Sequence, residues 1–242
     1  MTSRDYLRTL GERSASIFLL LLISGDLIFI LLHFLNTFAL SRPYHLYNIS
    51  EDRSYAEIYQ YLKFWWIAAL LLLIAWKNRE WRHIAWGAVF LYFLADDSLQ
   101  IHERGGLFIG PSLSFFPTFG LRLQDLGELA VSSIAAIPLL IFLLFAYRGG
   151  SQVFRKISQD IVLLILPLVF FGVVVDMAHQ AIKGGGQVDF ILGIVEDGGE
   201  MLSVSLLAWY FFLLSVRTDL RECYLFDFVR MIFNRFVFGR KS

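Results

Sequence analysis

The chain contains a single cysteine, Cys223. One thiol excludes an internal disulfide bond and any metal site built from several cysteines. Charged residues make up only 17% of the chain, whereas about 25% is usual in soluble domains. Basic and acidic residues balance at 21 each, so no net positive charge attracts nucleic acid. The sequence also lacks a phosphate-binding loop, a dinucleotide fingerprint, a haem-attachment motif, a nucleophile elbow and a lysine deep in an apolar run.

What the sequence has in excess is apolar residues, at 57% of the 242 residues, with a mean hydropathy of +0.61. They gather in six runs long enough to cross a bilayer, which needs about 20 residues. The runs cover residues 16–40, 58–76, 84–103, 123–147, 160–182 and 190–216. We therefore predict an all-α polytopic membrane helical bundle of six transmembrane helices, antiparallel because the connections are short. The first run follows arginines as a secretory signal does, but it is too long for one, so we expect it to stay uncleaved.

The distribution of basic residues predicts the orientation. Of the 21 lysines and arginines, fifteen fall on one side of the predicted bundle and six on the other, namely Arg42, Arg53, Lys63, Arg104, Arg122 and Lys183. The positive-inside rule then places both termini in the cytoplasm. We expect a bacterial inner membrane, with the outer ends of the helices facing the periplasm.

The last part of the chain differs from the six runs. Residues 218–242 are rich in phenylalanine, and Asp227, Arg230 and Asn234 share one helical face. We predict a bundle over 1–217 and a cytoplasmic amphipathic helix at the membrane interface over 218–242. A seventh helix packed against the bundle is equally compatible with this pattern.

The most unusual stretch runs from Ala95 to Glu103, where an apolar helix continues directly into three carboxylates, an amide and an imidazole. A charge at membrane depth costs about 2.5–3.5 kcal/mol on insertion scales and is usually functional. Asp96 and Asp97 followed by Ile101-His102-Glu103 also resemble a motif of uncharacterised bacterial multi-pass membrane proteins. The resemblance covers the third run and the acidic start of the sixth, and it implies no activity.

In the predicted orientation, four helices bring their ionisable groups to the same outer level. Nine acids lie there: Asp96, Asp97, Glu103, Asp125, Glu128, Asp176, Glu196, Asp197 and Glu200. The bases near this level are Arg104, Arg122 and Lys183. Three bases cannot neutralise nine acids, and unpaired buried carboxylates take up protons or bind metal.

Carboxylates together with imidazoles in a helical bundle are the ligand set of di-iron, di-manganese and zinc sites. We predict a divalent metal (Fe, Zn or Mn) held by ligands drawn from Asp96, Asp97, His102, Glu103, Asp176, His179, Glu196 and Glu200. Asp176 and His179 match half of the di-iron template, with Asp in place of Glu, and the other half is missing. The paired HxxxH of membrane ceramidases is absent too. Asp125 and Glu128 are the expected acid–base residues.

The remaining polar residues receive structural interpretations. We expect His33 to hydrogen-bond between helices rather than to ligate a metal. Asp26 lies deeper than the acids and is expected to relay protons or pair helices. His45 and His83 are expected to be solvated, and the apolar segment 105–120 is predicted to be a loop over the outer mouth of the bundle.

Three classes of function fit this sequence. The first is a metal-dependent enzyme that acts on a lipid or another hydrophobic substrate. The second is a transporter or channel for protons or divalent cations, with the acids as its outer vestibule. The third is a non-catalytic subunit of a membrane complex or a homo-oligomer. We rank the enzyme above the transporter because the inner halves of the second, fourth and sixth runs are almost wholly apolar.

Overall fold

The structure is a computed structural model that describes residues 3–112, 121–182, 185–217, 220 and 225. These residues form helices and no β-strand, which confirms the predicted all-α class. The helices are α1 (Ser3–Phe38), α2 (Tyr55–Asn78), α3 (His83–Leu99), α4 (Ile101–Ile109), α5 (Leu123–Gly149), α6 (Gln152–Val169), α7 (Asp176–Ile182) and α8 (Gly186–Val216). Two short 3₁₀ helices, η1 (His45–Tyr47) and η2 (Gly110–Ser112), and one π-helix, η3 (Phe170–Val175), complete the described elements.

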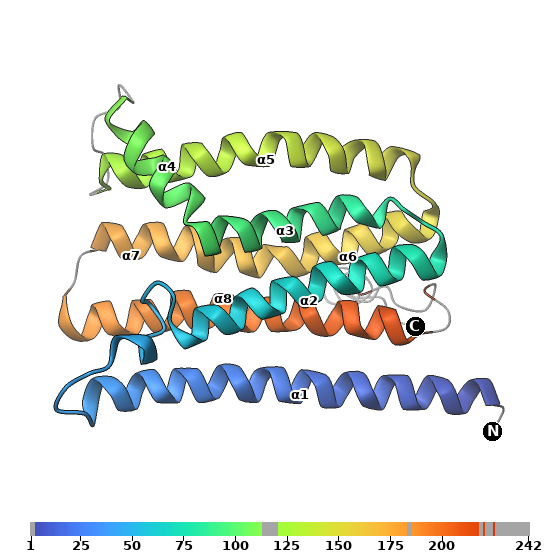
Figure 1. Cartoon of the computed structure of the whole chain (residues 1–242), viewed down its shortest axis with the longest axis horizontal. Coiled ribbons are helices and arrows are strands. Elements are labelled where there is room, and N and C mark those ends of the chain that lie inside the picture. Colours follow the sequence, from blue (N-terminus) through green and yellow to red (C-terminus); the bar gives the residue numbers. More distant parts are fainter. Residues whose placement is uncertain (1–2, 113–120, 183–184, 218–219, 221–224, 226–242) are drawn as a thin grey trace, which may run out of the picture.

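The long helices lie side by side along one axis, with α1 at one side of the bundle and α5 at the other (Figure 1). α1 packs on α8, α2 packs on α3 and α8, and α5 packs mainly on α4. Among the described residues, five helices are long and apolar enough to cross a membrane, and a sixth span results if α3 and α4 count as one. The structure thus supports an integral membrane helical bundle.

The third predicted span is not one continuous helix. The axes of α3 and α4 differ by 67°, and the break falls at Gln100, whose φ of 53° is left-handed. The Gln100 N–H still bonds to the carbonyls of Asp96 and Asp97, which closes the end of α3. α4 then runs to Ile109 and η2 to Ser112, so the start of the predicted loop over 105–120 is helical. Residues 113–120 lie outside the described part of the chain.

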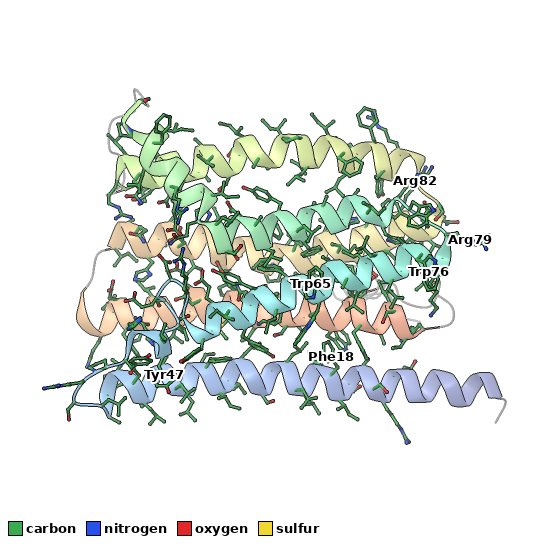
Figure 2. All side chains as sticks on the ribbon, in the orientation of Figure 1. Phe18, Tyr47, Trp65, Trp76, Arg79 and Arg82 are labelled. Atoms are coloured by element: carbon green, nitrogen blue, oxygen red, sulfur yellow. The ribbon has the colours of Figure 1, made fainter. Side chains whose placement is uncertain are left out.

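The two ends of the bundle differ in charge. Arg79 and Arg82 lie at the basic end, which is also the end where α1 begins, whereas Tyr47 lies at the opposite, acidic end (Figure 2). Lys77 donates from the basic end of α2 to the carbonyls of Ser215 (2.9 Å) and Arg217 (3.0 Å). A cation is favourable there because the last carbonyls of α8 have no partner within the helix. Of the predicted tail helix, only Leu220 and Leu225 are described.

The apolar core is built from α2, α3, α6 and α8, through residues such as Ile67, Phe90, Ile161 and Phe211. In contrast, α5 buries only Asp125, Gly127 and Ala146, and it contacts α6 lightly. Because α5 buries so few residues, it stands off from the core, and this separation positions the site described below.

Near its far end α6 contains Pro167, which cannot donate a backbone hydrogen bond, and the π-helix η3 follows.

A fully buried ion pair links three helices at mid-depth. The Lys63 ammonium on α2 donates to Asp26 on α1 (2.9 Å), and to the Met201 carbonyl (2.8 Å) and Ser205 hydroxyl (3.2 Å) on α8. The Ser205 hydroxyl donates in turn to Asp26 (2.5 Å). Two predictions from the sequence were therefore wrong. They were that no lysine lies deep in a span and that Lys63 belongs to the outer side. Asp26 pairs helices, which is one of its two predicted roles.

Two histidines were assigned structural or solvated roles from the sequence. His33 accepts a hydrogen bond from the Ile49 N–H (3.4 Å) in the segment before α2, and its ring stacks on Phe190 of α8. The contact of His33 with another helix is therefore ring stacking, not the predicted hydrogen bond. His83 is only 1% exposed and lies edge-on to the Phe154 ring, so the prediction that it is solvated was wrong. The start of α3 is covered by α6, which the sequence of α3 alone does not reveal.

Candidate functional site

A cavity of about 900 Å³ opens into the bundle at its acidic end. Its volume is within the range of about 300–1,000 Å³ that is usual for small-molecule sites. Eight of the nine acids predicted at this level line it together with His102: Asp96, Asp97, Glu103, Glu128, Asp176, Glu196, Asp197 and Glu200. The residues that the sequence placed at one depth on four helices thus line a single cavity.

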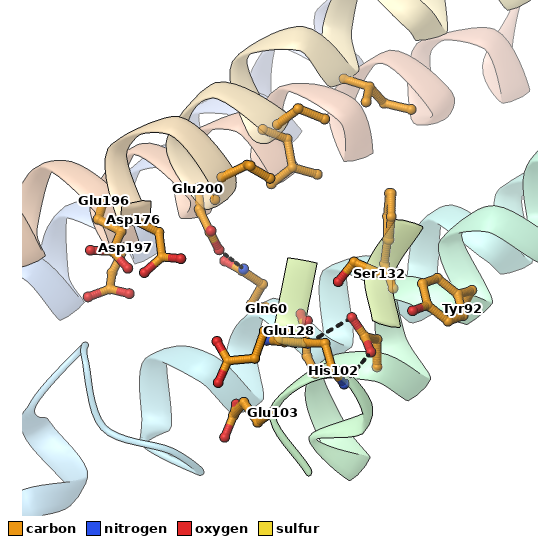
Figure 3. A pocket seen from close by; sticks show the side chains of 18 of the residues that line it. Gln60, Tyr92, His102, Glu103, Glu128, Ser132, Asp176, Glu196, Asp197 and Glu200 are labelled. Atoms are coloured by element: carbon orange, nitrogen blue, oxygen red, sulfur yellow. Dashed lines mark hydrogen bonds and ion pairs between the residues drawn. The ribbon is translucent and has the colours of Figure 1, made fainter. Parts of the chain in front are cut away.

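The ionisable side chains form two groups that face each other across the cavity (Figure 3). Asp176, Glu196 and Asp197 come from α7 and α8, whereas His102, Glu103 and Glu128 come from α4 and α5. Glu200 and Gln60 lie between the two groups. The segment before α2 also reaches the cavity through Ile49, Ser50, Glu51 and Asp52.

Below the carboxylates the lining becomes apolar and continues toward the basic end between α3, α5 and α6. Its residues include Trp86, Val89, Phe93, Leu139, Leu140, Leu143, Val162, Ile165, Leu166 and Val169. From Glu128 to Leu143 the α5 wall is about 22 Å long at about 1.5 Å per residue. The cavity therefore joins a polar mouth to a long apolar chamber.

The break at Gln100 brings His102 back onto the preceding helix. Its backbone N–H donates to one Asp96 oxygen (3.0 Å), and its ring Nδ1 contacts the other (2.9 Å). The Gln100 amide donates to Asp52 (2.5 Å) and to Glu103 (3.2 Å). A straight helix would place Asp96, Gln100 and Glu103 on one face, whereas the bend creates a His102–Asp96 pair instead.

The acids of α7 and α8 are also held by specific partners. Glu196 contacts the His179 Nδ1 (2.6 Å), and Asp176 lies beside Glu196 on the cavity wall. Asp197 accepts from the Ser50 hydroxyl (2.5 Å). The Glu200 carboxyl packs directly over Gly172 of the π-helix, where a side chain would collide with it. The π-helix therefore makes room for Glu200.

His179 does not line the cavity. Its Nδ1 contacts Glu196 (2.6 Å) and its Nε2 contacts Asp189 (3.0 Å), so both ring nitrogens already have carboxylate partners. The Asp176–His179 spacing that suggested half of a di-iron site therefore positions an imidazole behind Glu196.

The two expected acid–base residues have different surroundings. Glu128 lines the cavity and accepts from the Gln124 amide (2.8 Å). Asp125 is outside the cavity and buried, and the Arg122 guanidinium donates to it twice (2.6 and 2.9 Å). Asp125 also accepts from the Arg122 backbone N–H (2.6 Å), which caps the start of α5. Asp125 thus caps the start of α5, and its expected acid–base role stays a prediction.

The predicted metal ligands do not converge on one point. The described residues contain no group of three or more His, Cys, Asp or Glu side chains that could hold a metal ion. Among the proposed ligands, His102 pairs with Asp96 and His179 pairs with Glu196, whereas Glu103 and Glu200 accept hydrogen bonds from the amides of Gln100 and Gln60. Asp96, Asp97, His102 and Glu103 come from α3 and α4, whereas Asp176, His179, Glu196 and Glu200 come from α7 and α8. The structure therefore does not support the metal site expected from the sequence.

Sequence reasoning missed the contribution of α2. Gln60 lines the cavity and Lys63 forms the buried ion pair, one turn apart on the same helix. Together with Ala56 and Ile67 they follow the 3–4-residue spacing of a buried face. Polar residues at that spacing inside an apolar run were the signal available in the sequence.

The fold and the cavity define an integral membrane helical bundle with an amphiphilic internal site. Residues 15–216 match the family model described as a domain of unknown function (DUF8692). The chain belongs to this family, and the match covers the bundle but not the tail. No curated protein and no solved structure matches the chain.

Proposed function

We propose that this protein binds a lipid-like amphiphile from the membrane, with its polar head at the carboxylates and its apolar tail in the chamber between α3, α5 and α6. The observation that carries the proposal is that one cavity joins the acidic mouth to the apolar chamber. Sites for small molecules are mostly apolar and have a few polar groups that fix the ligand. A ligand with both characters matches both parts of the lining.

The position of α5 supports entry from the side. Leu140 on α5 and Leu166 on α6 both line the cavity, and each is more than half exposed. Since α5 contacts α6 only lightly, the chamber opens between these helices. A lipid tail could enter there without crossing the polar mouth.

The apolar depth of the chamber favours an amphiphile over an ion as its occupant. A proton or cation pathway needs polar groups or water beyond the acids, whereas Leu139, Leu143 and Ile165 line the deeper part. An isolated charge next to such side chains is strongly unfavourable. These residues are compatible with an alkyl chain.

The first test is to identify amphiphiles that co-purify with the protein and to measure their binding after the chamber is filled. We expect Leu143→Trp, whose side chain lines the chamber, to weaken binding about tenfold or more, because overpacking costs about 1–3 kcal/mol. Leu144→Trp is the matched control, because Leu144 is 54% exposed and lies outside the lining. Mass spectrometry of lipid extracts gives the bound amount. The proposal fails if no amphiphile binds, or if both variants bind like the original protein.

The His102–Asp96 pair supports a second candidate, acid–base chemistry on the bound head group. A carboxylate that contacts one ring nitrogen orients the imidazole, and such an imidazole can act as a general base. If the original protein chemically alters the head group of the bound amphiphile, we expect His102→Gln to abolish that reaction. The affinity of the variant for the amphiphile should stay within about threefold of the original value. Conversion is followed by mass spectrometry over time, and a molecule that stays unchanged in the original protein contradicts catalysis.

The reaction expected from the sequence also used a metal ion, and neither proposal includes one because the described residues form no ligand group for it. Elemental analysis of protein purified without chelator provides the check. One tightly held Fe, Zn or Mn ion per chain would show that the carboxylates rearrange around a metal, and it would restore the metal-dependent enzyme as the leading hypothesis.

A further inference from the structure

The junction between the acids and the apolar chamber contains a polar atom without a partner. Gln60 on α2 is 7% exposed and lines the cavity, and its amide nitrogen donates to Glu200 (3.3 Å). Its amide oxygen is buried and accepts no hydrogen bond from any described residue. Buried polar atoms almost always have a partner, so an unpartnered acceptor beside an empty volume indicates a hydrogen-bond donor in the ligand.

Glu200 is a second group at this junction that needs a hydrogen-bond donor from the ligand. It lies beside Gln60 in Figure 3, and its partly buried carboxyl lies between α2 and the π-helix. A carboxylate that loses hydration needs an opposite charge or a hydrogen-bond donor to balance that loss. Gln60 supplies a single long hydrogen bond, which leaves the second Glu200 oxygen to be satisfied.

Several donors elsewhere in the lining are already engaged, whereas the buried Tyr92 hydroxyl has no partner among the described residues. The Arg122 guanidinium donates to Asp125, which lies outside the cavity. The His102 Nδ1 faces Asp96, and the Gln124 amide donates to Glu128. The lining therefore presents mainly acceptors and negative charge to whatever occupies the cavity.

We propose that the amphiphile is a long-chain primary amine, whose ammonium group donates to the Gln60 amide oxygen and to the Glu200 carboxylate. An ammonium has three N–H donors and no acceptor, which complements this lining. A quaternary ammonium has the charge but no donor, and an alcohol has one donor but no charge. A fatty acid adds a further negative charge to an acidic site. This inference depends on the proposed binding function, since it names the head group of the same ligand.

The test compares four probes with the same tail: hexadecylamine, hexadecanol, hexadecyltrimethylammonium and hexadecanoic acid. Binding to the full chain is measured in nanodiscs of zwitterionic lipid, with empty nanodiscs as the blank. We expect hexadecylamine to bind about tenfold or more tightly than each of the other three, because charge-assisted hydrogen bonds are the strong ones.

Two variants localise the ammonium. We expect Gln60→Leu and Glu200→Gln each to weaken hexadecylamine binding about tenfold or more while leaving hexadecanol binding nearly unchanged. Gln159→Leu is the matched control, because Gln159 hydrogen-bonds to Tyr147 outside the cavity. Gln60→Glu keeps an acceptor and should retain amine binding. Thermal unfolding of each variant confirms that it is folded.

The outcomes separate this inference from the proposed function. If hexadecanol or hexadecyltrimethylammonium binds as tightly as the amine, or if Gln60→Leu does not weaken amine binding, the inference is overturned while amphiphile binding stands. If none of the four probes binds, the proposed function itself fails.

Discussion

Replacing Lys63 with Met should destabilise the protein by about 3–5 kcal/mol, because it leaves the Asp26 carboxylate without its counter-ion inside the bundle. Both side chains are 0% exposed, and the ammonium uses its three N–H donors on Asp26, Met201 and Ser205. The substitution preserves side-chain length, so the loss measures charge and hydrogen bonding rather than a cavity. Unfolding in mixed micelles with increasing denaturant gives the change in free energy.

The double variant Asp26→Asn, Lys63→Met provides the decisive comparison. It removes both charges and keeps an amide that can accept from Ser205, so it should recover most of the lost stability. Lys77→Met is the control on the same helix, because Lys77 lies at the exposed basic end, and its effect should stay below about 1 kcal/mol. An unchanged stability of Lys63→Met would mean that the ion pair does not hold α1, α2 and α8 together.

Replacing Gly127 with Ala should separate α5 from α4 and cost about 1–3 kcal/mol, because an added methyl group has no room. A Cβ at Gly127 would lie 2.5 Å from the Gly106 carbonyl oxygen, 2.9 Å from the Gly106 Cα and 2.9 Å from the Gly110 nitrogen. All three are backbone atoms, so no side chain can move aside. Glycines on both helices permit this close approach, as is common where membrane helices cross.

The same substitution at Gly87 in α3 should have the opposite sign. A Cβ there meets nothing within 4 Å, and a helical Gly→Ala change without a clash stabilises by about 0.5–1 kcal/mol. Since α4 carries His102 and α5 carries Glu128, Gly127→Ala should also weaken amphiphile binding, whereas Gly87→Ala should not. Thermal unfolding and the hexadecyl binding assay measure both effects. Equal stabilisation by the two substitutions would contradict the close crossing of α4 and α5.

The sequence by itself determined the class of the protein and the depth of its polar residues. A bilayer sets the length of a spanning helix, so six apolar runs were enough to predict an all-α membrane bundle. Counting residues inward from the ends of these runs also placed Asp96, Glu128, Asp176 and Glu200 at one level, and the structure brings these four into a single cavity. Length and depth are local properties of a segment, and the chain encodes them directly.

Which residues face each other was decided only by the tertiary structure. The left-handed conformation of Gln100 turns His102 back to Asp96, and the rotation of α2 directs Lys63 to Asp26. Whether α5 packs tightly or stands off cannot be read from its sequence, because a lipid tail is as apolar as a leucine side chain and satisfies the same surface. The carboxylates were therefore predictable as a set, whereas their partners, the absence of a metal-ligand group among the described residues and the apolar chamber depended on how the helices turn and pack.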